Sequence, residues 1–228
     1  MRLIDIYVYV GLPLVALSFV YVIVAVIPRL RLEQKQGGGL WLGIGKKVTG
    51  LCQQLQVNGI NASVVEERNF SRIKGQPHRG IYDAVVGIIK IEDREIDAVN
   101  VAQDTYSGWH SLDFIVRNPS SYSSTMRNDT KLVMKRSFKG NLLTFINIYS
   151  APIIDIEWRG DAELARELSF DSQLRDKLLN TDLETFCDRL EIVPEPKYGC
   201  VRIRTSYFWP TLEQFDILES IARHIKSG

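Results

Sequence analysis

Serine, histidine and aspartate occur together in one short stretch, and these residue types can form a nucleophilic triad. The stretch runs from Ser107 to Asp113 and includes His110 and Ser111. A serine hydrolase needs these groups to converge through the fold, and proximity in the sequence does not supply that geometry. No G-x-S-x-G nucleophile elbow precedes the stretch. His110 and Asp113 are therefore weak catalytic candidates, and a turn between strands explains Ser107-Gly108 more simply.

A second motif, Gly43-Ile44-Gly45-Lys46-Lys47, contains the residue types of a phosphate-binding loop. A P-loop needs a glycine five positions before its Gly-Lys pair and a Ser or Thr after it. Leu40 and Lys47 occupy those positions. Apolar residues recur at helical spacing from Trp41 onward, which predicts an amphipathic helix over residues 40–57. Lys46 and Lys47 are then expected at an edge that faces solvent or lipid headgroups.

Metal ligands usually converge from short, regular spacings of histidine, cysteine and acidic residues. The histidines and cysteines of this chain are scattered: His78, His110, His224, Cys52, Cys187 and Cys200. An odd number of cysteines does not form a complete disulfide framework. The sequence therefore predicts no metal site and no cofactor, with each cysteine a small core residue.

Two groups of cations could bind an anion. The candidates are Arg72, Lys74 and Arg79 in a loop with turn residues, and Arg189 and Arg204 in a predicted hairpin. Guanidinium and ammonium groups suit phosphate, so a lipid headgroup or a small anion is the expected ligand. The alternative is ordinary solvated surface charge.

The N-terminus contains an uncharged apolar run, Ile6–Ile27, of 22 residues. As a helix this run is about 33 Å long, enough to cross a hydrocarbon core of about 30 Å. The run is longer than a secretory signal core, and no small-residue cleavage site precedes Pro28, which opposes a cleaved signal. Residues 1–28 are therefore predicted to be a transmembrane anchor.

Cations flank the C-terminal side of this run and indicate its orientation. Arg29 and Arg31 follow the run, which places the rest of the chain in the cytoplasm by the positive-inside rule. A basic, Gly-rich tether, residues 29–39, would hold the domain close to the cell membrane. The membrane-interface candidates are Arg29, Arg31, Trp41, Lys46 and Lys47. The predicted helix over residues 40–57 then either packs in the core or lies on the bilayer.

Charge argues against nucleic acid as a partner. Residues 1–36 hold four of the 28 basic and two of the 27 acidic residues, which leaves the remainder with a formal charge of −1. Dedicated nucleic-acid binders usually show a basic excess.

The order of elements predicts an α+β fold with a mainly antiparallel sheet over residues 40–228, as one domain or as two lobes divided at residue 150. The predicted strands are Ile81–Ile91, Glu95–Val101, Leu112–Arg117, Lys131–Lys135, Leu142–Tyr149 and Ile153–Trp158. A helix capped by Asp161 precedes a C-terminal hairpin, in which Val193 is expected to pair with Cys200. Thr211 and Gln214 form a capping box that starts a final helix.

Three functions are compatible with these features. The first is a membrane-anchored, non-catalytic interaction domain, a small accessory subunit or assembly factor with protein partners in a membrane complex. The second is a module that binds lipid headgroups or small anions at the membrane surface. The third, a membrane-anchored hydrolase using His110 and Asp113, has the least support, because no complete catalytic motif accompanies these residues.

Overall fold

The structure is a computed structural model that describes residues 44–67, 83–104, 110–120, 126, 128–137, 152–186 and 189–227. The predicted anchor, the tether and the predicted strand Leu142–Tyr149 lie outside these residues. Within the described ranges, no helix is both long enough and apolar enough to cross a membrane.

The described strands form one antiparallel sheet, which confirms the predicted α+β class. The strand order is β1-β2-β3-β4-β8-β7-β5-β6. The bounds are β1 Ala62–Glu67, β2 Asp83–Ile91, β3 Ala98–Asp104, β4 His110–Arg117, β5 Thr130–Arg136, β6 Ile153–Arg159, β7 Glu191–Glu195 and β8 Cys200–Ser206. Because β8 pairs with β4 and β7 pairs with β5, strands from both halves of the chain interleave. A division into two lobes at residue 150 therefore does not describe this sheet.

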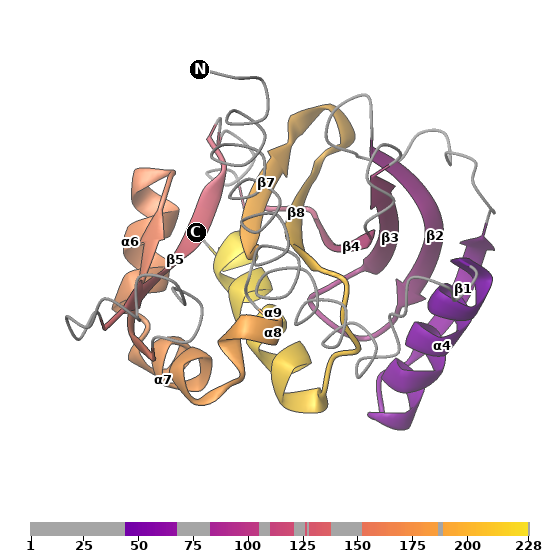
Figure 1. Cartoon of the computed structure of the whole chain (residues 1–228). Helices are drawn as coiled ribbons and strands as arrows, with labels where there is room; N and C mark the ends of the chain where they lie inside the picture. Colours follow the sequence, from indigo (N-terminus) through magenta and orange to yellow (C-terminus); the bar gives the residue numbers. More distant parts are fainter. Residues whose placement is uncertain are drawn as a thin grey trace, which may run out of the picture.

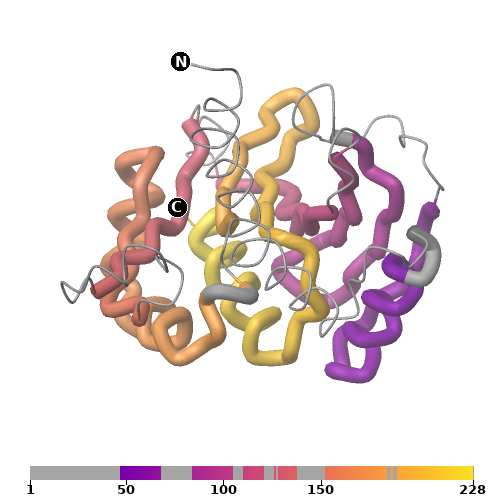
Figure 2. Tube along the Cα trace, viewed as in Figure 1, coloured from indigo at the N-terminus to yellow at the C-terminus, as the bar shows by residue number. Residues whose placement is uncertain are grey.

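The described helices contribute to one core on a single face of the sheet. Their bounds are α4 Ile44–Val57, α6 Ala162–Phe170, α7 Ser172–Asn180, α8 Leu183–Phe186 and α9 Leu212–Ser227. In Figure 1, α4 lies beside β1 at one end of the sheet, α6 and α7 lie at the other end, and α9 lies between them. Figure 2 follows the chain from the indigo α4 to the yellow α9 in the same view. Apolar side chains from all five helices join one buried cluster.

Side-chain caps fix where the helices begin, as the sequence predicts. The Asp161 carboxylate accepts hydrogen bonds from the backbone N–H groups of Glu163 and Leu164 at the start of α6. The Thr211 hydroxyl accepts from the N–H of Gln214, whose side chain accepts from the N–H of Thr211. This reciprocal pair is the predicted capping box of α9.

Helix α4 packs in the core, which decides between the two predicted positions for its apolar face. Val48, Leu51 and Leu55 are fully buried against the sheet. Gly87 on β2 makes this close approach possible, because a Cβ there would overlap the Val48 side chain. The strand also carries a bulge between Val85 and Gly87.

The C-terminal hairpin has the predicted faces but a register shifted by two residues. Cys200 pairs with Glu195 instead of Val193, and Ile192 pairs with Ile203. Strand β7 extends to Glu195, and a short 3₁₀ turn ends at Gly199, whose φ is +60°. The chain thus reverses over fewer residues than predicted. A shift of two keeps each side chain on its predicted face but changes its partner across the ladder.

Substituting Gly87→Ala should destabilise the domain by about 1–3 kcal/mol, because the new methyl group overlaps Val48. Val48→Ala in the same chain should recover part of that loss by making room. A double-mutant cycle of urea unfolding, followed by tryptophan fluorescence, measures this coupling. Strictly additive effects of the two substitutions would contradict the proposed contact.

Candidate functional site

A buried group of charges lies across the middle of the sheet. Asp113 on β4 and Arg202 on β8 are both fully buried. The Arg202 Nη1 donates to Asp113 Oδ2 at 3.0 Å, and the Arg204 Nε donates to Asp113 Oδ1 at 2.8 Å. Arg202 also forms an ion pair with Glu195 at 2.6 Å. Two guanidinium groups and two carboxylates therefore balance each other on this face of the sheet.

This ion network corrects the expectation that the polar face of the hairpin is solvated. Strand β8 lies between β4 and β7 in the interior of the sheet, so its side chains are buried on both faces. Arg204 pairs across the ladder with Glu191, and Arg189 lies in an exposed turn. The predicted Arg189–Arg204 pair is therefore not formed. With both oxygens held by guanidinium groups, Asp113 is positioned for a structural role.

A second polar cluster joins the first turn of α4 to the start of β4 and the end of β8. Lys47 is buried, and its Nζ lies 3.2 Å from Nδ1 of His110, the first residue of β4. The same ammonium lies 5.3 Å from the ring centroid of Tyr207, which follows β8. This placement corrects the prediction that Lys47 faces solvent or headgroups. Lys47 is four residues before Leu51 and eight before Leu55, so it belongs to the buried stripe of α4.

The protonation state of His110 follows from its neighbour. An ammonium group only donates hydrogen bonds, so Nδ1 of His110 accepts and Nε2 carries the proton. Burial, and then the positive charge of Lys47, lowers the pKa of His110 to about 4. The imidazole is therefore neutral near pH 7, and its Nε2 is buried without a hydrogen-bond partner.

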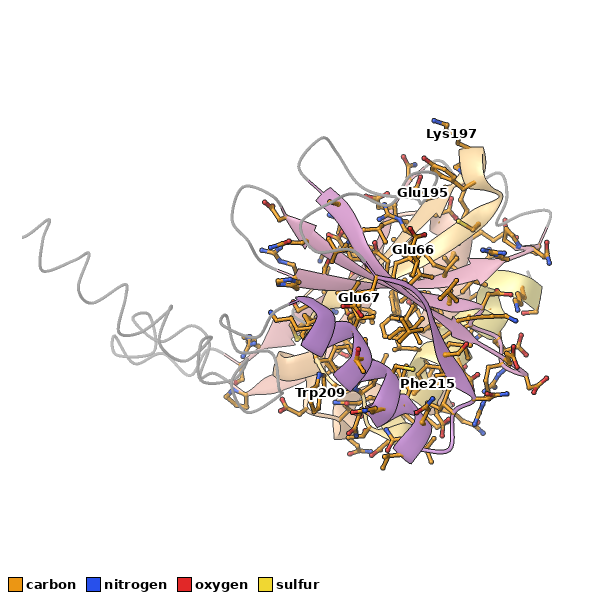
Figure 3. All side chains as sticks on the ribbon, turned by 90° about the vertical axis from the view of Figure 1, so that its right-hand side faces the viewer. Glu66, Glu67, Glu195, Lys197, Trp209 and Phe215 are labelled. Atoms are coloured by element: carbon orange, nitrogen blue, oxygen red, sulfur yellow. The ribbon has the colours of Figure 1, made fainter. Side chains whose placement is uncertain are left out.

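Tyr207 and Trp209 complete this cluster on the α4 side. The Tyr207 hydroxyl donates to the backbone carbonyl of Lys47 at 2.9 Å, and the Trp209 Nε1 donates to the Tyr207 hydroxyl at 3.2 Å. Burial raises the pKa of Tyr207 to about 12. Trp209 lies against α4 at Gly50, where a Cβ would approach the indole to 3.0 Å, and Figure 3 labels it beside the helix. The cluster therefore fastens α4 to the sheet.

The two weak catalytic candidates do not meet. His110 and Asp113 lie three residues apart on β4, so their side chains point to opposite faces of the sheet. His110 contacts Lys47 on the helical face, and Asp113 contacts Arg202 and Arg204 on the other. No proton can pass directly between them, and the structure assembles no hydrolytic pair from these residues.

Most other predicted site residues lie outside the described part of the chain. These are Arg29, Arg31, Trp41, Arg72, Lys74 and Arg79. Lys46 lies in the first turn of α4, where only its backbone is described. Cys52 and Cys200 are buried free thiols, as predicted, and burial raises the pKa of Cys200 to about 11. Among the residues that the structure describes, no three His, Cys, Asp or Glu side chains form a group able to hold a metal ion.

Sequence reasoning missed the cluster at Lys47 because its members are far apart in the chain. Lys47 and His110 are separated by 63 residues, and Lys47 and Tyr207 by 160. One local signal was available, since Lys47 shares the helical stripe of Leu51 and Leu55. A lysine on that stripe must be buried or must bend the helix away from the core.

Substituting Asp113→Asn should cost about 3–5 kcal/mol of unfolding free energy, because it removes the buried carboxylate that Arg202 and Arg204 share. The matched control is Glu157→Gln, which removes a carboxylate from an exposed ion pair with Arg159 and should cost at most about 1 kcal/mol. Urea unfolding measures both variants. Equal small losses would show that the buried network does not stabilise the fold.

The depressed pKa of His110 predicts a specific loss of stability in acid. In the unfolded chain His110 has a pKa near 6.5, whereas in the folded protein its pKa is about 4. Between these two pH values the unfolded state therefore binds a proton that the folded state does not. Stability should therefore fall between pH 6.5 and 4, by at most about 3 kcal/mol. His110→Asn keeps an acceptor for Lys47 and should remove this contribution. Urea unfolding at pH 7, 6 and 5 tests the difference, and parallel curves for both proteins would refute it.

Comparison with known proteins supplies no family for this chain. No protein-family model, no curated protein and no solved structure matches it. The case for a function therefore rests on the residues and their geometry.

Proposed function

We propose that this chain is a membrane-anchored interaction domain, an accessory subunit or assembly factor of a membrane complex. Residues 1–28 would cross the membrane, and the domain would lie on the cytoplasmic side. The apolar run Ile6–Ile27 and the cations Arg29 and Arg31 support this placement. The protein partner would bind the surface of the described domain.

The observation that carries the interaction role is a pair of exposed apolar side chains at the edge of the sheet. Ile154 on β6 is 61% exposed, and Phe170 at the end of α6 is 80% exposed. Their chain neighbours Asp155 and Ser169 line one hollow of about 210 Å³. Ile154 and Phe170 are thus each one residue away in the chain from a residue that lines the hollow, while Trp158 and Leu168 line it themselves. Large aromatic and aliphatic side chains beside a concavity are typical anchors of protein interfaces.

Charged groups form a polar rim around this hollow. Asp155 pairs with Arg175 at 2.8 Å, and Lys135 lies 3.3 Å from Glu157. The backbone N–H of Ile156, followed by these cations, lowers the pKa of Asp155. The rim carries both signs of charge, and Trp158 and Leu168 contribute apolar surface to the hollow. An apolar centre inside a polar rim is the usual anatomy of an interface between proteins.

The position of this surface also fits an anchored domain. Strand β6 is the last strand of the described sheet, and β1, which packs against α4, is the first. Figure 1 shows α4 and the pair α6 and α7 at opposite ends of the sheet. A partner bound at β6 would therefore lie at the end of the sheet opposite α4, the helix that follows the predicted tether.

The proposal predicts a partner whose binding depends on the β6 edge. Isolation in mild detergent should recover a stoichiometric partner with the natural chain, and Phe170→Asp should lose it by placing a charge in an apolar contact. Val57→Asp is the matched control, because Val57 is 81% exposed at the opposite end of the domain. Quantitative mass spectrometry measures the ratio of partner to chain. A clean monomer under several gentle detergents, or equal retention by both variants, would contradict the proposal.

A further inference from the structure

The two outer strands of the described sheet, β1 and β6, differ in how their outer edges are covered. On β1, side chains of α4 meet backbone groups of the edge. The Gln56 Nε2 donates to the carbonyl of Ala62 at 2.7 Å, and the backbone N–H of Val64 donates to the thiol of Cys52. Helix α4 therefore closes the β1 edge against pairing with a further strand.

On β6, the ladder with β5 shows which backbone groups point outward. Leu132 on β5 pairs with Trp158, but its N–H donates to the carbonyl of Leu190, before β7 on the other side of β5, at 3.0 Å. Leu132 and Trp158 are thus a non-hydrogen-bonded pair, so the backbone N–H and C=O of Trp158 point away from β5. Ile156, two residues earlier, has the same orientation, and its N–H donates to the side chain of Asp155 at 2.8 Å.

The hollow beside β6 reaches this outer edge. Four consecutive residues of the strand, Asp155 to Trp158, line it. Because consecutive side chains point to opposite faces of a sheet, a hollow that touches all four extends around the edge. Arg175 on α7 meets Asp155 Oδ1 at 2.8 Å, although Asp155 alternates with the core residues Ile156 and Trp158. The Asp155 carboxylate therefore lies at the outer edge, where it takes the place of a carbonyl group from a neighbouring strand.

We infer that β6 pairs with β6 of a second copy of this chain, in an antiparallel ladder about a two-fold axis. Ile156 lies opposite Trp158 of the second copy and exchanges two hydrogen bonds with it, and the symmetry repeats this pair. Asp155 then lies opposite Arg159 of the second copy at both ends of the ladder. A register with Ile156 opposite itself would place Asp155 opposite Glu157, so the charges select the first register.

Each charged group keeps a counter-charge in this dimer. The N–H of Ile156 bonds to the second copy, which releases the Asp155 carboxylate for Arg159 of that copy. Arg159 leaves its own Glu157, which it holds at 3.1 Å within one chain. Glu157 then faces Glu157 of the second copy on the two-fold axis, and a Lys135 ammonium at 3.3 Å balances each of these carboxylates.

The inference goes beyond the proposed function, because it names a second copy as the occupant of the strand edge. A two-fold axis perpendicular to the shared sheet keeps the helices of both copies on one face. Helix α6 of each copy, with Phe170, therefore stays on the same side for another subunit. The ladder is short and the dimer is weak, so the proposed anchor would strengthen it by confining both copies to one membrane.

A cross-link on the two-fold axis tests the pairing. In a full-length chain with Cys187→Ser, Glu157→Cys places two thiols at a non-hydrogen-bonded position, where Cα atoms are about 4.5 Å apart and a disulfide fits. Cys52 and Cys200 are buried and can remain. The matched control is Ile154→Cys, which is 61% exposed on the same strand but lies about 20 Å from its copy in this register. Mild oxidation in mild detergent should give at least about fivefold more covalent dimer with Glu157→Cys.

A charge reversal tests the register. Arg159→Asp places a carboxylate opposite Asp155 of the second copy at both ends of the ladder. It should raise the dissociation constant of the dimer at least about fivefold, because the change acts twice. Lys90→Asp is the matched control, since Lys90 and Arg159 each pair with a glutamate two residues away on an exposed surface. Sedimentation velocity over a range of chain concentrations measures both variants.

Hydrogen exchange separates strand pairing from side-chain docking. The amide of Trp158 points away from β5, so its exchange should slow at least about tenfold when the chain is concentrated enough to dimerise. The amide of Glu157 points toward β5 and should be unchanged by dilution. Mass spectrometry with fragmentation to single residues measures both amides.

Equal cross-linking of the Glu157→Cys and Ile154→Cys chains, or a chain that sediments as a monomer at every concentration, would overturn the dimer. Equal effects of Arg159→Asp and Lys90→Asp would overturn the register. Slower exchange at Trp158 only when another subunit is bound would assign the edge to that subunit instead. Failure of the proposed function is a separate result, because the cross-link needs only the chain itself.

Discussion

The pairing of β4 with β8 is the contact on which the rest of the fold depends. The pairing joins residues 110–117 to residues 200–206. In the described sheet it is the one ladder that connects β1–β4 with β8, β7, β5 and β6. Asp113 marks the register of this pairing, because its two oxygens are held by Arg202 and Arg204. A slip of one residue would turn these charges into the apolar core, at a cost of several kcal/mol for each unpaired ion. The ion network therefore specifies the pairing as much as it stabilises it.

The second constraint is the attachment of α4 to that central pair. Lys47 reaches His110 on β4, and Tyr207 after β8 donates to the backbone of Lys47. The helix nearest the predicted anchor is thus fastened to the strands that unite the sheet. Ile154 on β6 and Phe170 at the end of α6 are exposed, and these two elements lie at the end of the described sheet opposite α4. This arrangement suits the proposed role of holding a partner near a membrane.

Much of the fold follows from local sequence patterns. The caps at Asp161 and Thr211 could be predicted because each is a short-range contact between a side chain and the first turn of its own helix. Helix α4 and the hairpin of β2 and β3 could be predicted from their periods of apolar residues. The two faces of the last hairpin were also predicted correctly, since alternation along a strand does not depend on the partner. Strand β1 was not predicted, because Val64 and Val65 are both exposed and the strand lacks a clear alternation.

By itself, the sequence determined the class of fold, the helix starts and the likeness of Ile6–Ile27 to a membrane span, because each depends on neighbours within one or two turns of chain. Only the tertiary structure decided the register of the last hairpin, the burial of Arg202 and the position of Lys47. It also separated His110 from Asp113, which adjacency in the sequence had suggested as a pair. These outcomes depend on β8 entering the middle of the sheet between β4 and β7. Arginine is usually expected at the surface, but Arg202 is buried at this place. A buried charge is stable only beside its counter-charge, and Asp113, the partner of Arg202, lies 89 residues away in the chain.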